Sequence, residues 1–139
     1  MRYCSVLKYE FCKNGLVRFR AIQGVHDSYL TTVQVSRGEV ESFLKTLSVL
    51  EAHLGANQLK SFGSVDRIFF WLRKIVFVCE VKEFTHPKYK ASLVLYLAKN
   101  RFEEMFFYIK GKFFFCEQAF FSDYAATKKM FEILKESLK

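Results

Sequence analysis

The chain has 139 residues and a formal net charge of +8, from 22 lysines and arginines against 14 aspartates and glutamates. This length suits one domain that buries its own core without a disulfide or a metal. The positive charge biases non-specific association toward polyanions, namely nucleic acid or an anionic membrane surface. A membrane-spanning helix is excluded, because Arg73 and Lys74 interrupt the longest apolar run.

Four scattered cysteines and the first residues of the chain bear on its compartment. No two cysteines have the spacing of a zinc motif or a redox pair, so we expect neither a metal nor another cofactor. The first residues lack the apolar core of a secretory signal, so we expect free thiols in an intracellular, reducing compartment, the cytoplasm or the nucleus. The cysteines are Cys4, Cys12, Cys79 and Cys116.

The first quarter of the chain alternates apolar and polar side chains with a period of two, which is typical of β-strands. Asn14 and Gly15 form the strongest short hairpin signal, and a second turn is expected at residues 24–28. We therefore expect three strands, over residues 4–11, 17–22 and 29–35.

The period changes at Ser36, which begins a capping box with Glu39. Apolar residues then recur at helical spacing until Gly55, so the pattern predicts a helix between these points. Residues 56–64 are polar, and we interpret them as a linker between two halves of the chain.

The second half begins with residues 65–84, an apolar run rich in strand-forming residues that we interpret as one bent strand or two. A hairpin with Gly111 near its tip is expected further on, and Ser122 with Asp123 is expected to cap a last helix. The remaining expected elements are strands over residues 91–98, 105–110 and 112–121 and a helix over residues 124–138.

The two halves follow the same order of strands and then a capped helix. An offset of 86 residues places Lys13-Asn14 on Lys99-Asn100, and one helix cap on the other. The sequence therefore predicts an α+β fold of two pseudo-repeats, with the helices packed on one face of the antiparallel sheets. The single domain would comprise repeat one (1–55), the linker (56–64) and repeat two (65–139).

This order of elements, with its Lys-Asn turns, resembles the PUR repeat of the purine-rich-element-binding proteins. In that family four antiparallel strands precede one helix, and the second strand ends in a Lys-Glu-Asn-x-x-Gly turn. The nearest stretches here are Lys13-Asn14-Gly15 and Lys99-Asn100-Arg101, which lack the glutamate; the second also lacks the glycine. The first half has no evident first strand before Arg2.

The resemblance implies that the two repeats intertwine and that the ligand is single-stranded DNA or RNA. Whirly and related two-repeat proteins share the strand-and-helix order and also bind single strands. Membership of either family therefore implies the same class of ligand.

Single-strand binding needs cations for the phosphates and flat side chains for the bases. A sheet covered by helices on one face leaves the other face free, and the alternation assigns residues of both halves to that free face. Further cations fall at turn tips, where phosphate contacts are natural. The candidate residues are Lys8, Arg18, Arg20, Tyr96, Phe106, Tyr108 and Lys110 on the strands, and Lys13, Lys99 and Arg101 at the turns.

The 17 phenylalanines admit a different interpretation, since they can form the core or an interface. We expect Phe113 and Phe115 to be covered by the facing repeat or by a second copy in a homodimer; the other explanation is that bases stack on them. The alternative function is therefore protein–protein interaction through exposed Phe-rich strands, without nucleic acid.

Catalysis has no motif in this sequence. The three histidines are far apart, and no phosphate loop, nucleophile elbow or paired-carboxylate motif is present. The prediction is a binding protein rather than an enzyme.

Overall fold

The structure is a computed structural model that describes residues 5–53 and 55–138. The expected roles of Cys4 as a strand residue and a free thiol therefore lie outside the described residues. The fold is α+β, as predicted, with two antiparallel sheets and three α-helices.

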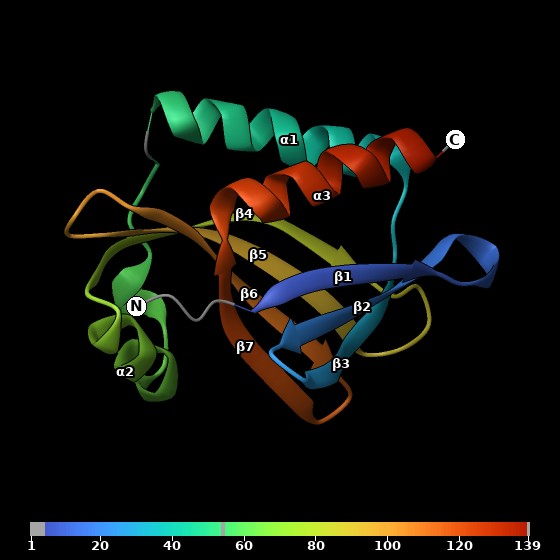
Figure 1. Cartoon of the computed structure of the whole chain (residues 1–139), viewed down its shortest axis with the longest axis horizontal. Helices are drawn as coiled ribbons and strands as arrows, with labels where there is room; N and C mark the ends of the chain where they lie inside the picture. The colour runs from blue at the N-terminus through green and yellow to red at the C-terminus, as the bar shows by residue number, and fades with distance from the viewer. Residues whose placement is uncertain (1–4, 54, 139) are drawn as a thin grey trace.

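The first sheet has the order β1-β2-β3 and the second the order β4-β5-β6-β7 (Figure 1). Helix α1 follows the first sheet, α2 precedes the second, and α3 follows it. The bounds are β1 Val6–Phe11, β2 Leu16–Gln23, β3 His26–Gln34, α1 Arg37–Ala52, α2 Ser64–Leu72, β4 Ile75–Thr85, β5 Ala91–Asn100, β6 Met105–Phe113, β7 Cys116–Asp123 and α3 Tyr124–Ser137.

Local chemistry at the turns and caps agrees with the sequence predictions. Asn14 and Gly15 both have positive φ, 62° and 74°, which these two residue types tolerate best. The capping box of α1 is present, since the Ser36 hydroxyl accepts from Glu39 N and the Glu39 carboxylate accepts from Ser36 N. The carboxylate of Asp123 caps α3 by accepting from Ala126 N.

Helices α1 and α3 lie side by side over the two sheets (Figure 1). Both sheets turn their apolar faces toward this helix pair and toward each other, so one core serves both halves. Phe43 of α1 packs on Phe107 of the second half, with ring centroids 5.9 Å apart. Phe131 of α3 packs on Phe19 of the first half at 6.2 Å. Each helix therefore covers strands of the other half.

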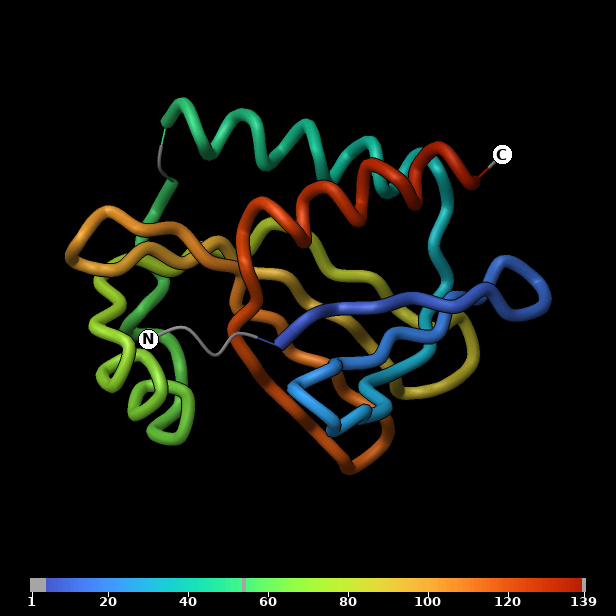
Figure 2. Tube along the Cα trace, viewed as in Figure 1, coloured from blue at the N-terminus to red at the C-terminus, as the bar shows by residue number. Residues whose placement is uncertain are grey.

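The sheets meet where β3 crosses β5 and β6 (Figure 2). Leu30 presses on the backbone of Gly111, where a Cβ atom would lie 2.8 Å from Leu30 Cβ. Thr31 Oγ1 donates to the carbonyl of Lys112 at 2.8 Å, and Gln118 Nε2 donates to the carbonyl of Tyr29 at 3.0 Å. A side chain larger than that of glycine would force the two sheets apart at this crossing.

Three sequence predictions are wrong, two in the second half and one in the first. Residues 65–84 are not one or two strands, because the run divides into α2 and β4 at Lys74, whose φ is 58°. The β6–β7 hairpin turns at Phe114 and Phe115, since Gly111 lies within β6 under Leu30. The turn expected at residues 24–28 is shorter, as β3 already begins at His26.

The segment from residue 56 to 64 is fastened to the edge of β4 rather than free. Asn57 donates from Nδ2 to the carbonyl of Val76 at 2.8 Å and accepts from Val78 N at 3.1 Å. Gln58 extends the pairing by donating from its backbone to the carbonyl of Val78. This bonding directs the chain to the far side of the second sheet, where α2 packs.

The elements of the two halves correspond at the offset of 86 residues. Adding 86 to the bounds of β1 gives 92–97, which lies within β5, and adding it to α1 gives 123–138, which overlaps α3. The strands β2 and β3 overlap β6 and β7 in the same way. Strand β4 has no counterpart among the described residues of the first half.

Candidate nucleic-acid interface

The outer face of the first sheet carries the cations predicted for it. Since Leu7, Val17 and Phe19 are buried in the core, their neighbours Lys8, Arg18 and Arg20 lie on the opposite face. Lys8 pairs with Arg20 in the β1–β2 register, which brings these two cations side by side. The structure thus places three sequence-predicted site residues together on one open surface.

Two acidic residues fix the arginines of this face. Arg18 donates to Glu10 Oε1 at 3.1 Å, and Arg20 donates to both carboxylate oxygens of Asp27. The hydrogen bond to Arg20 holds the pKa of Asp27 below its ordinary value, and the same bond raises the pKa of Arg20. Lys8 forms no ion pair with a described residue, so its ammonium is available to a phosphate.

Four aromatic side chains continue this face onto the second half, and we call them the aromatic ladder. Consecutive ring centroids lie 5.5 Å, 4.6 Å and 5.7 Å apart along the ladder. The ladder begins on β3 beside the arginines and ends in the β4–β5 turn, where His86 adds a further ring at 4.7 Å. Its members in order are Tyr29, Phe113, Phe114 and Tyr89.

The ladder is accessible and is accompanied by cations at both ends. A shallow hollow of about 580 Å³ joins Arg18 and Arg20 to Tyr29 and Phe113. At the other end Tyr89 lies between two exposed lysines, at positions 88 and 90, and Phe114 N donates to the carbonyl of residue 90 at 2.8 Å. Cations therefore flank both ends of a continuous row of rings on this surface.

The outer face of the second sheet is not free, which corrects the prediction for its residues. Helix α2 covers it, with Phe70 packed at 4.7 Å from the ring of Tyr108. Tyr108 is only 1% exposed, and its hydroxyl donates to Asp66 Oδ1 at 2.5 Å. Burial and this hydrogen bond raise the pKa of Tyr108 well above its ordinary range. A base cannot stack on a ring in this position.

The other three residues predicted for that free face are also engaged with the α2 region. Tyr96 is half-buried against Phe62 at 5.0 Å, and Phe106 packs into the same second cluster. Lys110 forms ion pairs with Asp66 at 2.9 Å and with Glu117 at 3.1 Å. Burial opposes the charge of Lys110, but the hydrogen bonds to these carboxylates outweigh it and raise the pKa.

The cations predicted at turn tips lie at two separate places. Lys13 is exposed in the β1–β2 turn, at the opposite end of the molecule from the β5–β6 loop (Figure 1). In that loop Lys99 is ion-paired with Glu103, and the guanidinium of Arg101 lies 5.1 Å from the ring of Phe102. The structure therefore does not gather Lys13, Lys99 and Arg101 into one site.

Sequence reasoning missed part of the ladder because its rings come from three separate turns and strands. The sequence assigns Tyr29 to a strand without a role and predicts cover for Phe113 and Phe115. Within the chain Phe113 is only half-buried and Phe115, in the β6–β7 turn, is fully exposed, because no element of the other half reaches over this turn. A local signal existed at Tyr89, since a tyrosine between two lysines in a turn is typical of an exposed cation-and-ring unit.

The described residues hold no group of three or more histidine, cysteine or acidic side chains that could bind a metal ion. Cys12, Cys79 and Cys116 carry free thiols. Within the described ranges, no helix is both long and apolar enough to cross a membrane. No family model matches the chain, and neither a curated protein nor a solved structure matches it.

Proposed function

We propose that the chain binds single-stranded DNA or RNA along the open face of the first sheet and the aromatic ladder. The observation that carries this proposal is the continuous row of rings from Tyr29 to Tyr89, flanked at each end by cations. Bases stack on such rings with about 1–3 kcal/mol each, whatever their sequence. The lysines and arginines supply the phosphate contacts.

The charge and spacing of the surface suit an extended strand. Arg18 and Arg20 stand two residues apart on β2, so their side chains start about 7 Å from each other. Five cations lie along the surface (Lys8, Arg18, Arg20, Lys88 and Lys90) against the two carboxylates of Glu10 and Asp27. The surplus is positive, and phosphate binding there would release counterions.

The test is a fluorescence-anisotropy titration of a mixed-sequence single-stranded 24-mer at low and at moderate salt. We expect micromolar or tighter binding that weakens steeply as salt rises. The double variants Tyr29→Ala with Phe113→Ala, and Arg18→Ala with Arg20→Ala, should each weaken binding by roughly tenfold or more.

The matched control is Lys45→Ala with Lys60→Ala, which removes two exposed cations from outside the surface. This control should retain wild-type affinity. Absence of binding at low salt, or equal losses in the control and the Arg18 and Arg20 variant, would refute the proposal.

A second candidate function, protein interaction, is supported by α2 rather than by the Phe-rich strands. The outer side of this helix exposes a row of large apolar side chains, of which Trp71 is 77% exposed. Such a patch suits a homodimer or another protein partner. A monomeric mass for the wild type in light scattering would exclude the homodimer, whereas a dimer that Trp71→Ser dissociates would support it. The exposed row is Val65, Ile68, Phe69, Trp71 and Leu72.

A further inference from the structure

Strand β1 forms an edge of the first sheet, since the strand order is β1-β2-β3. Its six residues pair with β2 on one side only, so about half of their backbone N–H and C=O groups point outward along some 20 Å. An exposed edge of this kind is a template for one more strand.

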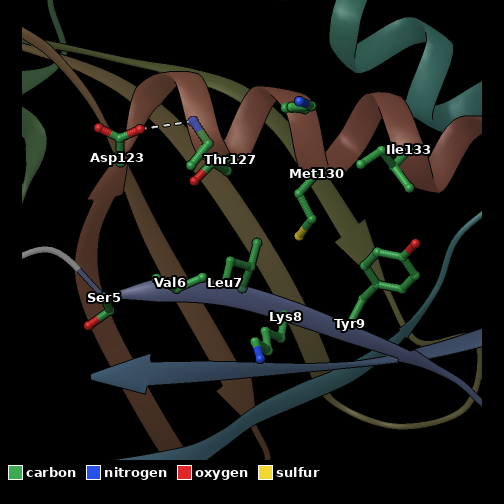
Figure 3. Close-up of a pocket in the computed structure, with 11 residues that line it drawn as sticks. Ser5, Val6, Leu7, Lys8, Tyr9, Asp123, Thr127, Met130 and Ile133 are labelled. Carbon is green, nitrogen blue, oxygen red and sulfur yellow. Dashed lines mark hydrogen bonds between the residues drawn. The ribbon is translucent and has the colours of Figure 1, made fainter. Parts of the chain in front are cut away.

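A groove runs along this edge between β1 and α3 (Figure 3). Leu7 and Tyr9 point up from the strand, and Met130 points down from the helix toward the same space (Figure 3). The groove has a volume of about 500 Å³ and apolar walls, to which Ile133 contributes a side chain that is 51% exposed. A volume in this range is typical of ligand-binding sites.

In the second half of the chain, a strand occupies the position that corresponds to this groove. There β5, which corresponds to β1, has β4 paired antiparallel along its outer edge. Alternate residues of β4 enter the core, and its Phe84 stacks on Phe131 of α3 at 6.1 Å. The buried residues of this face of β4 are Phe77, Cys79, Val81 and Phe84.

One end of the edge is already closed by the chain itself. Ser5 N donates to the carbonyl of Phe121 at 3.1 Å, and Ser5 forms a parallel bridge with Ser122 at the end of β7. The chain continues from β7 directly into α3. An added strand would therefore begin beside Ser5 and would be covered by the apolar side chains of α3. The edge that remains open for pairing is that of β1.

The rim of the groove is cationic. Lys8 and Lys129 line it and are exposed, and neither forms an ion pair with a described residue. The one acidic residue of the lining, Asp123, is engaged as the cap of α3. A strand that enters the groove is therefore favoured by acidic side chains on its solvent face.

We propose that the groove binds an extended segment of a partner protein, which pairs antiparallel with β1 as a fourth strand. The segment would alternate apolar residues, which enter between Leu7 and Met130, with acidic residues near Lys8 and Lys129. A second copy of the chain fits less well, because its β1 carries its own α3 into the space that one strand fills. The site contains no ring of the aromatic ladder and shares only Lys8 with the proposed nucleic-acid surface.

The probe is a fluorescein-labelled peptide of about ten residues that alternates valine and glutamate. We expect saturable binding in anisotropy, together with slower hydrogen exchange of the β1 amides. Two peptide controls test the basis of recognition. One has the same composition with all valines in a single block, and the other replaces each glutamate by lysine; both should bind at least ~10-fold more weakly.

The variants Met130→Glu and Ile133→Glu should each weaken peptide binding by at least ~10-fold, because they place a carboxylate on the apolar wall. Val49→Glu is the matched control, since Val49 is 57% exposed on α1 away from the groove. Circular dichroism and the affinity for the 24-mer should stay at wild-type values in all three variants. Loss of peptide binding with unchanged 24-mer binding would therefore test the groove proposal independently of the proposed nucleic-acid function.

Equal binding of the alternating and block peptides, or no β1 protection, would overturn the proposal. So would a dimer that Met130→Glu and Ile133→Glu both dissociate, because the occupant would then be a second copy.

Discussion

The outer faces of the two sheets carry similar residue types, yet one is open and the other is covered. On the first sheet Arg18, Arg20 and Tyr29 face solvent, and the two arginines form exposed ion pairs with acidic neighbours. On the second sheet Tyr108 and Lys110 lie beneath α2 and share the carboxylate of Asp66. The same alternation of polar and aromatic residues thus forms an exposed surface in the first half and part of a buried core in the second.

The difference comes from a helix inserted between the halves. Residues 56–64 pair with β4 and carry the chain around the edge of the second sheet, so α2 reaches the face that the first sheet leaves bare. Strand periodicity reports which residues share a face, but it does not report what covers that face. The candidate residues of the two halves therefore had different outcomes.

The largest effect is expected from Phe70→Ala, which removes the anchor of α2. Phe70 is 2% exposed and contacts the rings of Phe62, Tyr108 and Phe121. Loss of this ring should lower the free energy of unfolding by about 3–5 kcal/mol, measured by urea denaturation. Phe69→Ala, on the exposed side of the same helix, should change it by less than ~1 kcal/mol. Equal effects would mean that α2 does not cover the sheet.

A smaller loss is expected from Asp66→Ala. This change leaves the hydroxyl of Tyr108 without its acceptor and removes one of the two carboxylates that pair with Lys110. The free energy of unfolding should fall by about 1–3 kcal/mol. Glu117→Ala removes only an exposed partner of Lys110 and should cost less than ~1 kcal/mol. If the free energy of unfolding falls equally in the two variants, the buried hydrogen bond contributes no more to stability than the exposed ion pair.

Alkaline pH should destabilise the packing of α2 on the covered face. Burial, with a hydrogen bond to Asp66, raises the folded-state pKa of Tyr108 above its unfolded value of about 10. This stabilisation is therefore complete below about pH 10 and is lost as the pH rises toward the folded-state pKa. In Tyr108→Phe the stability should fall less steeply above pH 10. Identical pH profiles for this variant and the wild type would contradict the assignment.

The smallest effect is expected on the open face, from Asp27→Asn. The change removes a negative charge and frees Arg20 from its ion pair. Affinity for the single-stranded 24-mer should rise by roughly threefold at low salt and by less at moderate salt. A fall in affinity would mean that Asp27 is needed to orient Arg20, and that the proposed surface binds in another way.

Much of the fold follows from local patterns, and the exceptions have physical causes. The caps at Ser36 and Asp123, the Asn14-Gly15 turn and the alternating strands are determined by neighbouring residues, so the sequence alone predicted them. Helix α2 was missed because residues 68–72 are an unbroken apolar run, which fits a buried strand as well as a helix, although only Phe70 of this helix is buried.

The candidate site was predictable only where it is local. Lys8, Arg18 and Arg20 follow from strand alternation, and the structure places them as expected. The aromatic ladder joins β3, the β6–β7 turn and the β4–β5 turn, and such long-range packing leaves no period in the sequence. Tyr108 failed as a candidate for the same reason, because α2 covers it from more than 30 residues away along the chain.

The crossing of the halves has a consequence for how the protein is made. When the ribosome has completed α1, the strands that will cover Phe43 and Leu47 have not been synthesised, since Phe107 and its neighbours come some 60 residues later. The nascent first half must hold these apolar side chains exposed until α3 emerges, and folding then requires closure of long loops. A gene cut between the halves should therefore yield two fragments that are unfolded alone and regain structure only when they are mixed.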